Sequence, residues 1–438
     1  MLKRLGLSAT TAGQTTSAAL FPSKLEFNPP AHGVWNIVHV GMLVPEAHQI
    51  YVCAINCMRG VTLTAAEMGA SNRFSCVVLK EEDITRGTVE KVTLEGIAEV
   101  LRKLADRGDL PPCVIVFPVC THHFLGVRMS RVYRELEREF PTVDFVRAFM
   151  DPIMKRRLSP DQRLRKAMFD PLRSCDADGH LVAFLGSDFA LADDCELREL
   201  LQEGGFRLRE LQDCTTYAEY RTLAQAGLFV ATYPNARYGI EKLAARLGRP
   251  FLYLPSCFSY AQIQEQYQQL CDTLGMSLPD FTYEIARCEE SLTALKELVG
   301  DTPIVIDASF HPRPLGLARL LCEHGFAVTE VYLDGINPEE EDDLVWLREN
   351  APEVLLSSIV LPELRVATRT RDQKVLALGQ KAVWFTGTSH FVNVVEGGGL
   401  WGFAGICAVA SLMDEAWSAP KDVRDLIPRK GLGCASCF

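Results

Sequence analysis

From about residue 34 onward, short apolar runs alternate with longer amphipathic segments. The runs 74–79, 113–118 and 227–231 have the length and composition of buried strands, whereas 88–105 has the spacing of an amphipathic helix. Strands that alternate with helices build parallel sheets flanked by helices. The alternation therefore predicts an α/β protein with doubly wound parallel sheets.

The same alternation predicts further elements along the chain. Strands are expected at 35–40, 143–146, 206–208, 251–254, 302–307, 326–333 and 382–386. Helices are expected at 193–203, 237–247, 260–298, 315–324, 339–350 and 403–417, with Gly248 ending the second of these.

The length of 438 residues exceeds what one hydrophobic core usually organises. We predict three Rossmann-like α/β domains, at 34–159, 160–299 and 300–425, none of which has a G-x-G-x-x-G fingerprint after its first strand. Residues 1–33 are rich in Ser, Thr, Ala and Pro and are expected to form a flexible arm. Residues 426–438 form a tail with a C-x-x-C pair, Cys434 and Cys437.

Charge and composition exclude several classes of protein. A net charge of -11 argues against nucleic-acid binding, which usually needs a basic face. No run approaches the ~18 apolar residues of a membrane span, and no apolar segment of a signal peptide follows Lys3 and Arg4. The fifteen cysteines are scattered through core-like runs, which is typical of a reducing compartment. We expect a cytoplasmic protein.

Three cysteines stand where strand-like runs end. Cys53 closes one such run, Cys57 follows it by four residues, and Cys120 follows the run 113–118. Ligands of α/β proteins bind beyond the carboxyl ends of the strands, and thiolates are the usual protein ligands of iron–sulfur clusters. A ligand must be deprotonated and reachable, which suits Cys57 and Cys120 better than Cys53. A fourth ligand has to come from elsewhere, and a second subunit is a natural source.

The surroundings of these cysteines resemble a known family. The segment 38–61 resembles the part of nitrogenase component 1 subunits that carries a cluster-binding cysteine, at the position of Cys57. The His-Gly-Pro of that family is absent, and Val52-Cys53-Ala54 stands in its place. The segment 117–126 resembles the family's later strand–loop cysteine, at the position of Cys120. A further family cysteine lies upstream, where this chain has none, so Cys53 is the candidate for its role.

Two later segments extend the resemblance, which covers roughly 34–420. The segment 230–251 resembles the region around the family's active-site cofactor cysteine, but Thr232 stands at that position. The segment 391–405 resembles the family's glycine-rich segment, with Val392 near the position of the cofactor histidine. These departures argue against the usual iron–molybdenum cofactor and leave room for a different second metal cofactor or an organic substrate. Within the superfamily, the match is better to nitrogenase-like proteins than to nitrogenase itself.

The resemblance implies a fold, partners and a function. It implies three α/β domains per subunit and a paralogous component 1-like subunit in a heterodimer or heterotetramer. It also implies an ATP-dependent iron-protein reductase as electron donor. On this hypothesis, Cys53, Cys57 and Cys120 hold an iron–sulfur cluster, [4Fe-4S] or larger, at a subunit interface. The cluster would relay low-potential electrons to a site between the domains of an oxidoreductase.

Two alternatives stay open at this stage. The threonine at 232 fits a non-catalytic scaffold for assembly of a complex metal cofactor equally well. A weaker alternative is a metal-free ligand-binding protein of the periplasmic-binding type.

Candidate catalytic residues lie near a glycine-rich turn and after a predicted strand. His390 and Glu396 lie near the triple glycine 397–399 and are candidate acid–base groups, and Arg237 follows the strand at 227–231. His122, close to Cys120, is either a metal ligand or proton donor, or an imidazole bonded to the backbone, and the second interpretation is favoured. No Ser-His-Asp or Walker motif supports hydrolytic or nucleotide chemistry.

Overall fold

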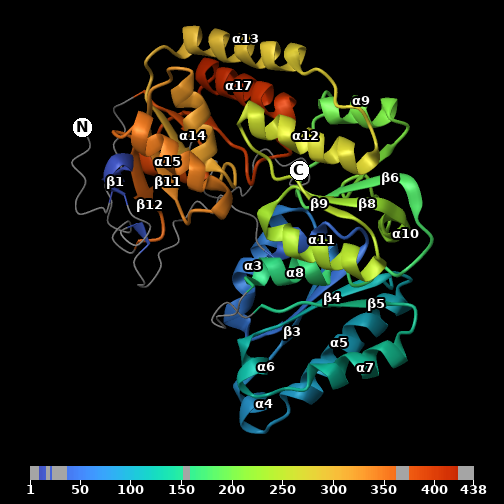
Figure 1. Cartoon of the computed structure of the whole chain (residues 1–438). Coiled ribbons are helices and arrows are strands. Elements are labelled where there is room, and N and C mark those ends of the chain that lie inside the picture. The colour runs from blue at the N-terminus through green and yellow to red at the C-terminus, as the bar shows by residue number, and fades with distance from the viewer. Residues whose placement is uncertain (1–8, 16–19, 22–36, 151–157, 362–373, 423–438) are drawn as a thin grey trace. The chain divides into compact units, whose positions relative to one another are not determined.

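The computed structural model describes residues 9–15, 20–21, 37–150, 158–361 and 374–422 (Figure 1). The chain divides into two compact units. One, here called the cysteine unit, comprises 35–188 and 206–253. The other, the C-terminal unit, comprises 1–34, 189–205 and 254–437. The described residues contain three sheets, so the α/β class with parallel sheets is confirmed. The predicted division into three domains stays a prediction, and the tail 426–438 lies outside the described residues.

The first sheet of the cysteine unit is parallel throughout, with the order β3-β2-β4-β5. Its strands are β2 (Ala47–Cys53), β3 (Phe74–Val78), β4 (Cys113–Pro118) and β5 (Asp144–Arg147). All seven residues of β2 are buried because both faces of the sheet are covered. Ile50 and Val52 pack on the side of α5 (Val89–Asp106) and α7 (Met129–Glu139). Tyr51 and Cys53 point to the opposite face, as strand alternation requires.

The second sheet is also parallel, with the order β7-β6-β8-β9. Its strands are β6 (Asp178–Leu185), β7 (Arg207–Glu210), β8 (Ala226–Ala231) and β9 (Phe251–Tyr253). Helix α11 (Pro234–Leu247) follows β8 and ends at Gly248, which has φ 67°. The left-handed backbone there confirms the predicted helix end.

The remaining described helices of the cysteine unit have 13 residues or fewer. They are α2 (Ile37–Met42), α3 (Ile55–Glu67), α4 (Glu81–Thr85), α6 (Cys120–Phe124), α8 (Pro160–Ala167), α10 (Tyr217–Thr222) and the 3-10 turns η2 (Ser71–Arg73) and η3 (Leu223–Gln225).

The C-terminal unit has one six-stranded sheet, with the order β1-β12-β11-β10-β13-β14. Its strands are β1 (Ala9–Thr11), β10 (Ile304–Asp307), β11 (Val328–Leu333), β12 (Leu355–Ser358), β13 (Leu376–Leu378) and β14 (His390–Val392). Only β1 runs antiparallel to its neighbour among the described strands. Residues 9–14, which composition assigns to a flexible arm, instead form this edge strand and the 3-10 turn η1 (Ala12–Gln14).

The described α-helices of this unit have between 7 and 18 residues. They are α9 (Glu196–Glu203), α12 (Tyr260–Leu274), α13 (Thr282–Val299), α14 (Pro314–Glu323), α15 (Glu341–Asn350), α16 (Gln380–Thr386), α17 (Gly402–Ser418) and the 3-10 turn η4 (Pro338–Glu340). Helix α13 lies against α17 (Figure 1). None of the described helices combines the length and apolar character that crossing a membrane requires.

Two predicted strands are wrong. The described part of 35–40 belongs to helix α2, and 382–386 belongs to helix α16. Both runs are buried almost all round, and a short buried helix has the same apolar pattern as a central strand. The helix at 382–386 is fixed by a distant residue, because the Asp307 carboxylate accepts a hydrogen bond from Ala382 N at 2.6 Å.

Two carboxyl groups, half-buried Glu196 and buried Glu340, hold the first turns of two more helices. Glu196 accepts hydrogen bonds from the N–H groups of Phe403 (2.7 Å) and Ala404 (3.1 Å) in α17. Glu340 accepts one from Leu315 N (2.8 Å) in α14. Each carboxyl oxygen satisfies N–H groups that the helix itself leaves without partners.

Glu340 makes stability depend on pH. Burial raises its pKa to about 8, and Asp343 adds to this, while the Leu315 and Asn337 N–H groups and Arg313 oppose it. The folded state therefore holds a proton that the unfolded state releases above pH ~4.5, so this contribution to stability falls as pH rises to about 8. The free energy of unfolding should therefore decline between pH 5 and 8.5. We expect this decline to be about 1–3 kcal/mol smaller in Glu340→Gln than in the unchanged protein, measured by urea unfolding at each pH. Equal declines in both proteins would contradict this.

Candidate functional site

The pairing of β2 with β4 brings two of the predicted cysteines to one edge of the first sheet. The strands are parallel, and Val52 lies opposite Pro118. Their carboxyl ends therefore coincide, with Cys53 as the last residue of β2 and Cys120 two residues beyond β4. The sequence predicts this edge as the site, and Cys53 and Cys120 lie on it, with Cys57 in the helix that follows β2.

Cys57 lies in the first turn of α3. Ala54 keeps an extended backbone as the chain leaves β2, and Cys57 N donates to Ala54 O at 2.9 Å. The thiol is exposed. The N-terminal turn of a 13-residue helix favours negative charge, so the position suits an anionic sulfur ligand.

Cys53 is buried, unlike Cys57. It has no exposed surface and belongs to the hydrophobic core that includes Tyr51 and Phe117. Burial raises the pKa of its thiol to about 12, with Cys76 and Cys57 adding to the effect. Cys53 is therefore a thiol of the hydrophobic core that keeps its proton at neutral pH. Cys76 of β3 lies on the same face of the sheet, a proximity that only the strand order reveals.

Cys120 is half-buried, and a histidine fixes the turn that carries it. The imidazole of His122 accepts a hydrogen bond from Val119 N at its Nδ1 (3.2 Å), so the proton sits on Nε2, 2.9 Å from Thr93 Oγ1. Burial lowers the His122 pKa to about 4, so the ring is neutral. His122 is therefore the backbone-bonded imidazole that the sequence favours, and it positions Cys120 at the start of α6.

The three cysteines differ in how well they suit a metal cluster. Among the described residues, no three or more His, Cys, Asp or Glu side chains gather closely enough to hold a single metal ion. Cys57 and Cys120 are reachable thiols in the first turns of the helices that follow two paired strands, and they fit the role of cluster ligands. Cys53 fits it less well because its sulfur is buried and protonated.

The candidate catalytic residues are divided between the units. Arg237 is exposed on α11 in the cysteine unit, with its guanidinium 4.4 Å from the ring centre of Tyr253. His390 begins β14 in the C-terminal unit, where its Nδ1 is 3.1 Å from Ala416 O. Glu396 lies in the same unit, has φ 51°, and donates its N–H to Ser309 O at 2.8 Å. The structure does not place these three side chains in one described cluster.

The glycine-rich turn before α17 is explained by packing. Gly397, Gly398 and Gly399 all have positive φ. A Cβ on Gly399 would collide with the carbonyl oxygen of Ala190, and one on Gly397 with the ring of His311. Only glycine fits these positions, and the turn brings the chain to the start of α17.

The resemblance aligns Thr232 with the family's cofactor cysteine, and the polar groups of this threonine are already hydrogen-bonded within the chain. Thr232 is buried, and both its N–H (3.2 Å) and its hydroxyl (3.5 Å) donate to Leu185 O. Nearby, the buried Arg165 binds Asp188 through two bonds of 2.6 and 2.7 Å, with its guanidinium 4.8 Å from the ring centre of Tyr233. This ion pair at the end of β6 was not predicted, because its partners lie on different elements.

Comparisons with known proteins show a family, from a family model, and a fold, from solved structures. The model for nitrogenase component 1 type oxidoreductases matches residues 38–377. A solved structure titled "Nitrogenase Cp1 at pH 6.5" is similar with a TM-score of 0.68 and 11% identity, over 91% of this chain and 94% of that one. A second, "Nitrogenase Cp1 at pH 5", has a TM-score of 0.56 and 13% identity, over 94% of each chain. No curated protein sequence matches the chain significantly.

Thiol labelling distinguishes the three cysteines. In cluster-free, folded protein at pH 8, we expect iodoacetamide to modify Cys57 readily and Cys53 at least about 100-fold more slowly, because Cys53 is buried and protonated. Cys53 and Cys57 share the tryptic peptide 25–59, so fragment ions from tandem mass spectrometry measure the two rates, with exposed Cys175 and buried Cys271 as internal standards. Equal rates for Cys53 and Cys57 would contradict the structure of this edge.

Proposed function

The chain belongs to the nitrogenase component 1 type oxidoreductases, and from this we propose that it is a subunit of an oxidoreductase complex that holds an iron–sulfur cluster. The observation that carries the proposal is that Cys57 and Cys120 lie in the first turns of the helices that follow two paired parallel strands, β2 and β4. Thiolates at such an edge are suitable cluster ligands. The cluster, [4Fe-4S] or larger, would relay low-potential electrons to a site between the domains.

The chain's own residues have distinct tasks in this proposal. Cys57 and Cys120 are the principal ligands, and Cys53 is a third ligand that must lose its proton before it binds iron. His122 holds the turn of Cys120 through its bond to Val119 N. The core around Cys53 limits the access of water to the site. Solvent exposure and hydrogen bonds to the sulfurs together set the reduction potential of a cluster. When bound, the cluster supplies one-electron transfer.

Exposed apolar side chains on the same loops support a partner subunit. Ile55 and Leu63 of α3 are 69% and 53% exposed, and Phe124 and Leu125 beside Cys120 are 67% and 46% exposed. Large apolar side chains exposed together mark protein interfaces. A paralogous component 1-like subunit covering them would supply the missing ligands and complete a heterodimer or heterotetramer. An ATP-dependent iron-protein reductase would be the electron donor, in the cytoplasm.

The site that receives the electrons is proposed to use His390 and Glu396 as acid–base groups and Arg237 as an anion-binding group. His390 is held by its Nδ1 bond to Ala416 O and by packing on Trp417, with ring centres 5.1 Å apart. A group fixed in this way is pre-oriented for proton transfer. A second metal cofactor at this site would need ligands other than Thr232.

One observation favours the alternative of a non-catalytic scaffold for cofactor assembly. The Thr232 hydroxyl is already bonded to Leu185 O and is buried, so it offers no ligand to a cofactor. Electron uptake separates the two functions. A cluster that is reduced by the iron protein in an ATP-dependent way supports the oxidoreductase, whereas a cluster or precursor that is transferred to another protein supports the scaffold.

Removal of single thiols tests the cluster. In the complex purified without oxygen, we expect about four or more irons per subunit pair, with sulfide in similar amount. Cys57→Ser and Cys120→Ser should each lower the iron content at least about threefold, because each removes a thiolate ligand. Iron and sulfide are measured chemically, and circular dichroism confirms folding.

The matched control is Cys175→Ser, which removes an exposed thiol from the same unit and should leave the iron content unchanged. Cys53→Ala tests the third ligand, with a loss of iron expected. Full iron content in both the Cys57→Ser and the Cys120→Ser variants would refute the proposed site.

Charged substitutions test the partner surface. We expect Leu63→Glu and Phe124→Glu to weaken association with the partner subunit at least about tenfold, because each would place a charge in an apolar interface. Sedimentation velocity of the co-expressed subunits measures association. Leu298→Glu on α13 is the control, since Leu298 is similarly exposed at 44% but lies in the other unit. Undiminished association in both test variants would contradict the surface.

A further inference from the structure

Two cysteines of the C-terminal unit lie side by side on packed helices. Cys288 of α13 and Cys407 of α17 are 119 residues apart in sequence, yet their Sγ atoms are 3.6 Å apart. The Cys288 thiol has a single proton, which it donates either to Sγ of Cys407 or to Phe403 O, 3.3 Å away. A disulfide bond measures about 2.05 Å, so the sulfurs need to approach by about 1.5 Å to form one.

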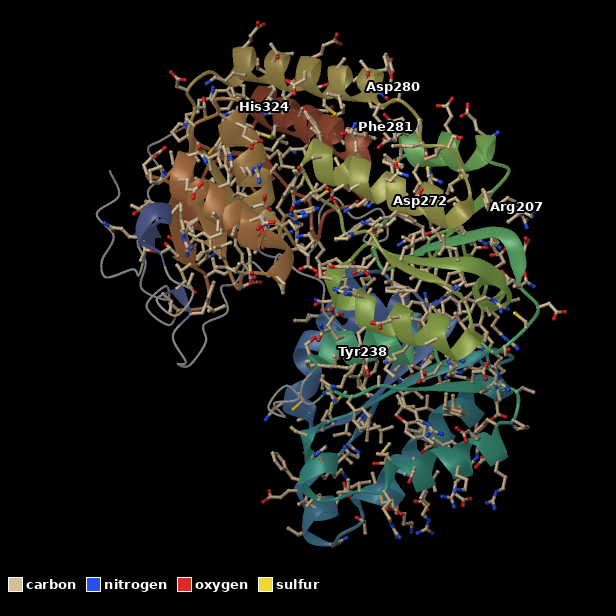
Figure 2. The ribbon with its side chains drawn as sticks, viewed as in Figure 1. Arg207, Tyr238, Asp272, Asp280, Phe281 and His324 are labelled. Atoms are coloured by element: carbon tan, nitrogen blue, oxygen red, sulfur yellow. The ribbon has the colours of Figure 1, made fainter. Side chains whose placement is uncertain are left out.

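The helices that carry the pair are held firmly in place. Phe281, just before α13, packs against Phe403 of α17 and Tyr267 of α12, with ring centres 5.1 and 4.7 Å apart. Further along α13, Glu289 is bonded to Nε2 of His324 at 3.2 Å. Phe281 and His324 are labelled in Figure 2. Contacts on both sides of Cys288 therefore fix the distance between the two thiols.

The two thiols have different surroundings. Cys288 has no exposed surface, whereas Cys407 is half-buried and reachable. The hydrogen bond from the Cys288 thiol lowers the pKa of Cys407, and the Ser291 hydroxyl and Arg287 add to this effect. The same bond raises the pKa of Cys288. A reachable thiolate beside a buried thiol is the arrangement of an attacking and a resolving cysteine.

We propose that Cys288 and Cys407 form a reversible disulfide by exchange with a small-molecule disulfide such as oxidised glutathione. The Cys407 thiolate attacks one sulfur of glutathione disulfide, whose S–S bond breaks, and one glutathione leaves as a thiolate. Cys288 then loses its proton and attacks Sγ of Cys407, which releases the second glutathione. The two protein thiols lose two electrons and two protons, and one glutathione disulfide becomes two glutathione thiols.

The disulfide would tie the C-terminal helix to α13. Helix α17 begins beside the glycine-rich turn 397–399, and Glu196 holds its first N–H groups. A covalent link at Cys407 secures the helix at a second point. The inference goes beyond the proposed cluster, because both cysteines belong to the C-terminal unit and none of the proposed ligands does.

The test uses the full chain in glutathione buffers of increasing oxidised fraction. After trapping with N-ethylmaleimide and trypsin digestion, we expect a disulfide-linked pair of peptides that begin at Cys288 and Ala382. Dithiothreitol should remove the link. The urea midpoint of unfolding should rise on oxidation, because the link restricts the unfolded chain.

Single variants assign the roles. Cys407→Ser should abolish both the link and the rise in midpoint, whereas Cys288→Ser should leave Cys407 as a stable mixed disulfide with glutathione. Cys271→Ser, which removes a buried thiol from α12, should behave like the unchanged chain. The link should also form in Cys57→Ser protein, so loss of the cluster and loss of the disulfide are separate outcomes. Folded protein whose two thiols stay reduced in fully oxidised glutathione would overturn the proposal.

Discussion

The candidate site depends on the parallel pairing of β2 with β4. Parallel strands end at the same edge of a sheet, so the loops after Cys53 and after Pro118 emerge together although they are far apart in sequence. The burial of all seven β2 residues fixes this register, because a shift by one residue would turn Cys53 and Tyr51 to the opposite face. The helix starts that carry Cys57 and Cys120, and the exposed apolar residues beside them, follow from this pairing.

Buried and half-buried polar groups then set where the helices begin. His122 fixes the turn of Cys120 in the cysteine unit, while Asp307 and Glu196 fix α16 and α17 in the C-terminal unit. A buried polar group without a partner is costly, so each of these bonds specifies one local arrangement. The chain thus combines an apolar framework, which gives the sheets, with a few polar contacts that place the residues proposed to carry chemistry.

Local pattern predicted much of this arrangement. The alternation of strand-like and helix-like segments predicted the parallel sheets, and the positions of Cys57 and Cys120 after strands predicted a common edge. The pattern was wrong at 35–40 and at 382–386, where a short buried helix has the same apolar composition as a strand. It also missed Arg165 with Asp188, and Cys288 with Cys407, because these pairs depend on packing between elements that are distant in sequence. The burial of Cys53 was also not predictable from the local pattern, because it depends on the residues that pack against the Tyr51 face of the sheet.

The central claim is that the edge formed by β2 and β4 holds a redox-active iron–sulfur cluster. The most direct measurement is the low-temperature EPR spectrum of the dithionite-reduced complex, purified without oxygen together with its partner subunit. The account predicts the signal of a reduced iron–sulfur cluster, absent from the Cys57→Ser and Cys120→Ser complexes and present with Cys175→Ser. A folded, partner-bound complex without iron, or a cluster signal that survives loss of both Cys57 and Cys120, would contradict it.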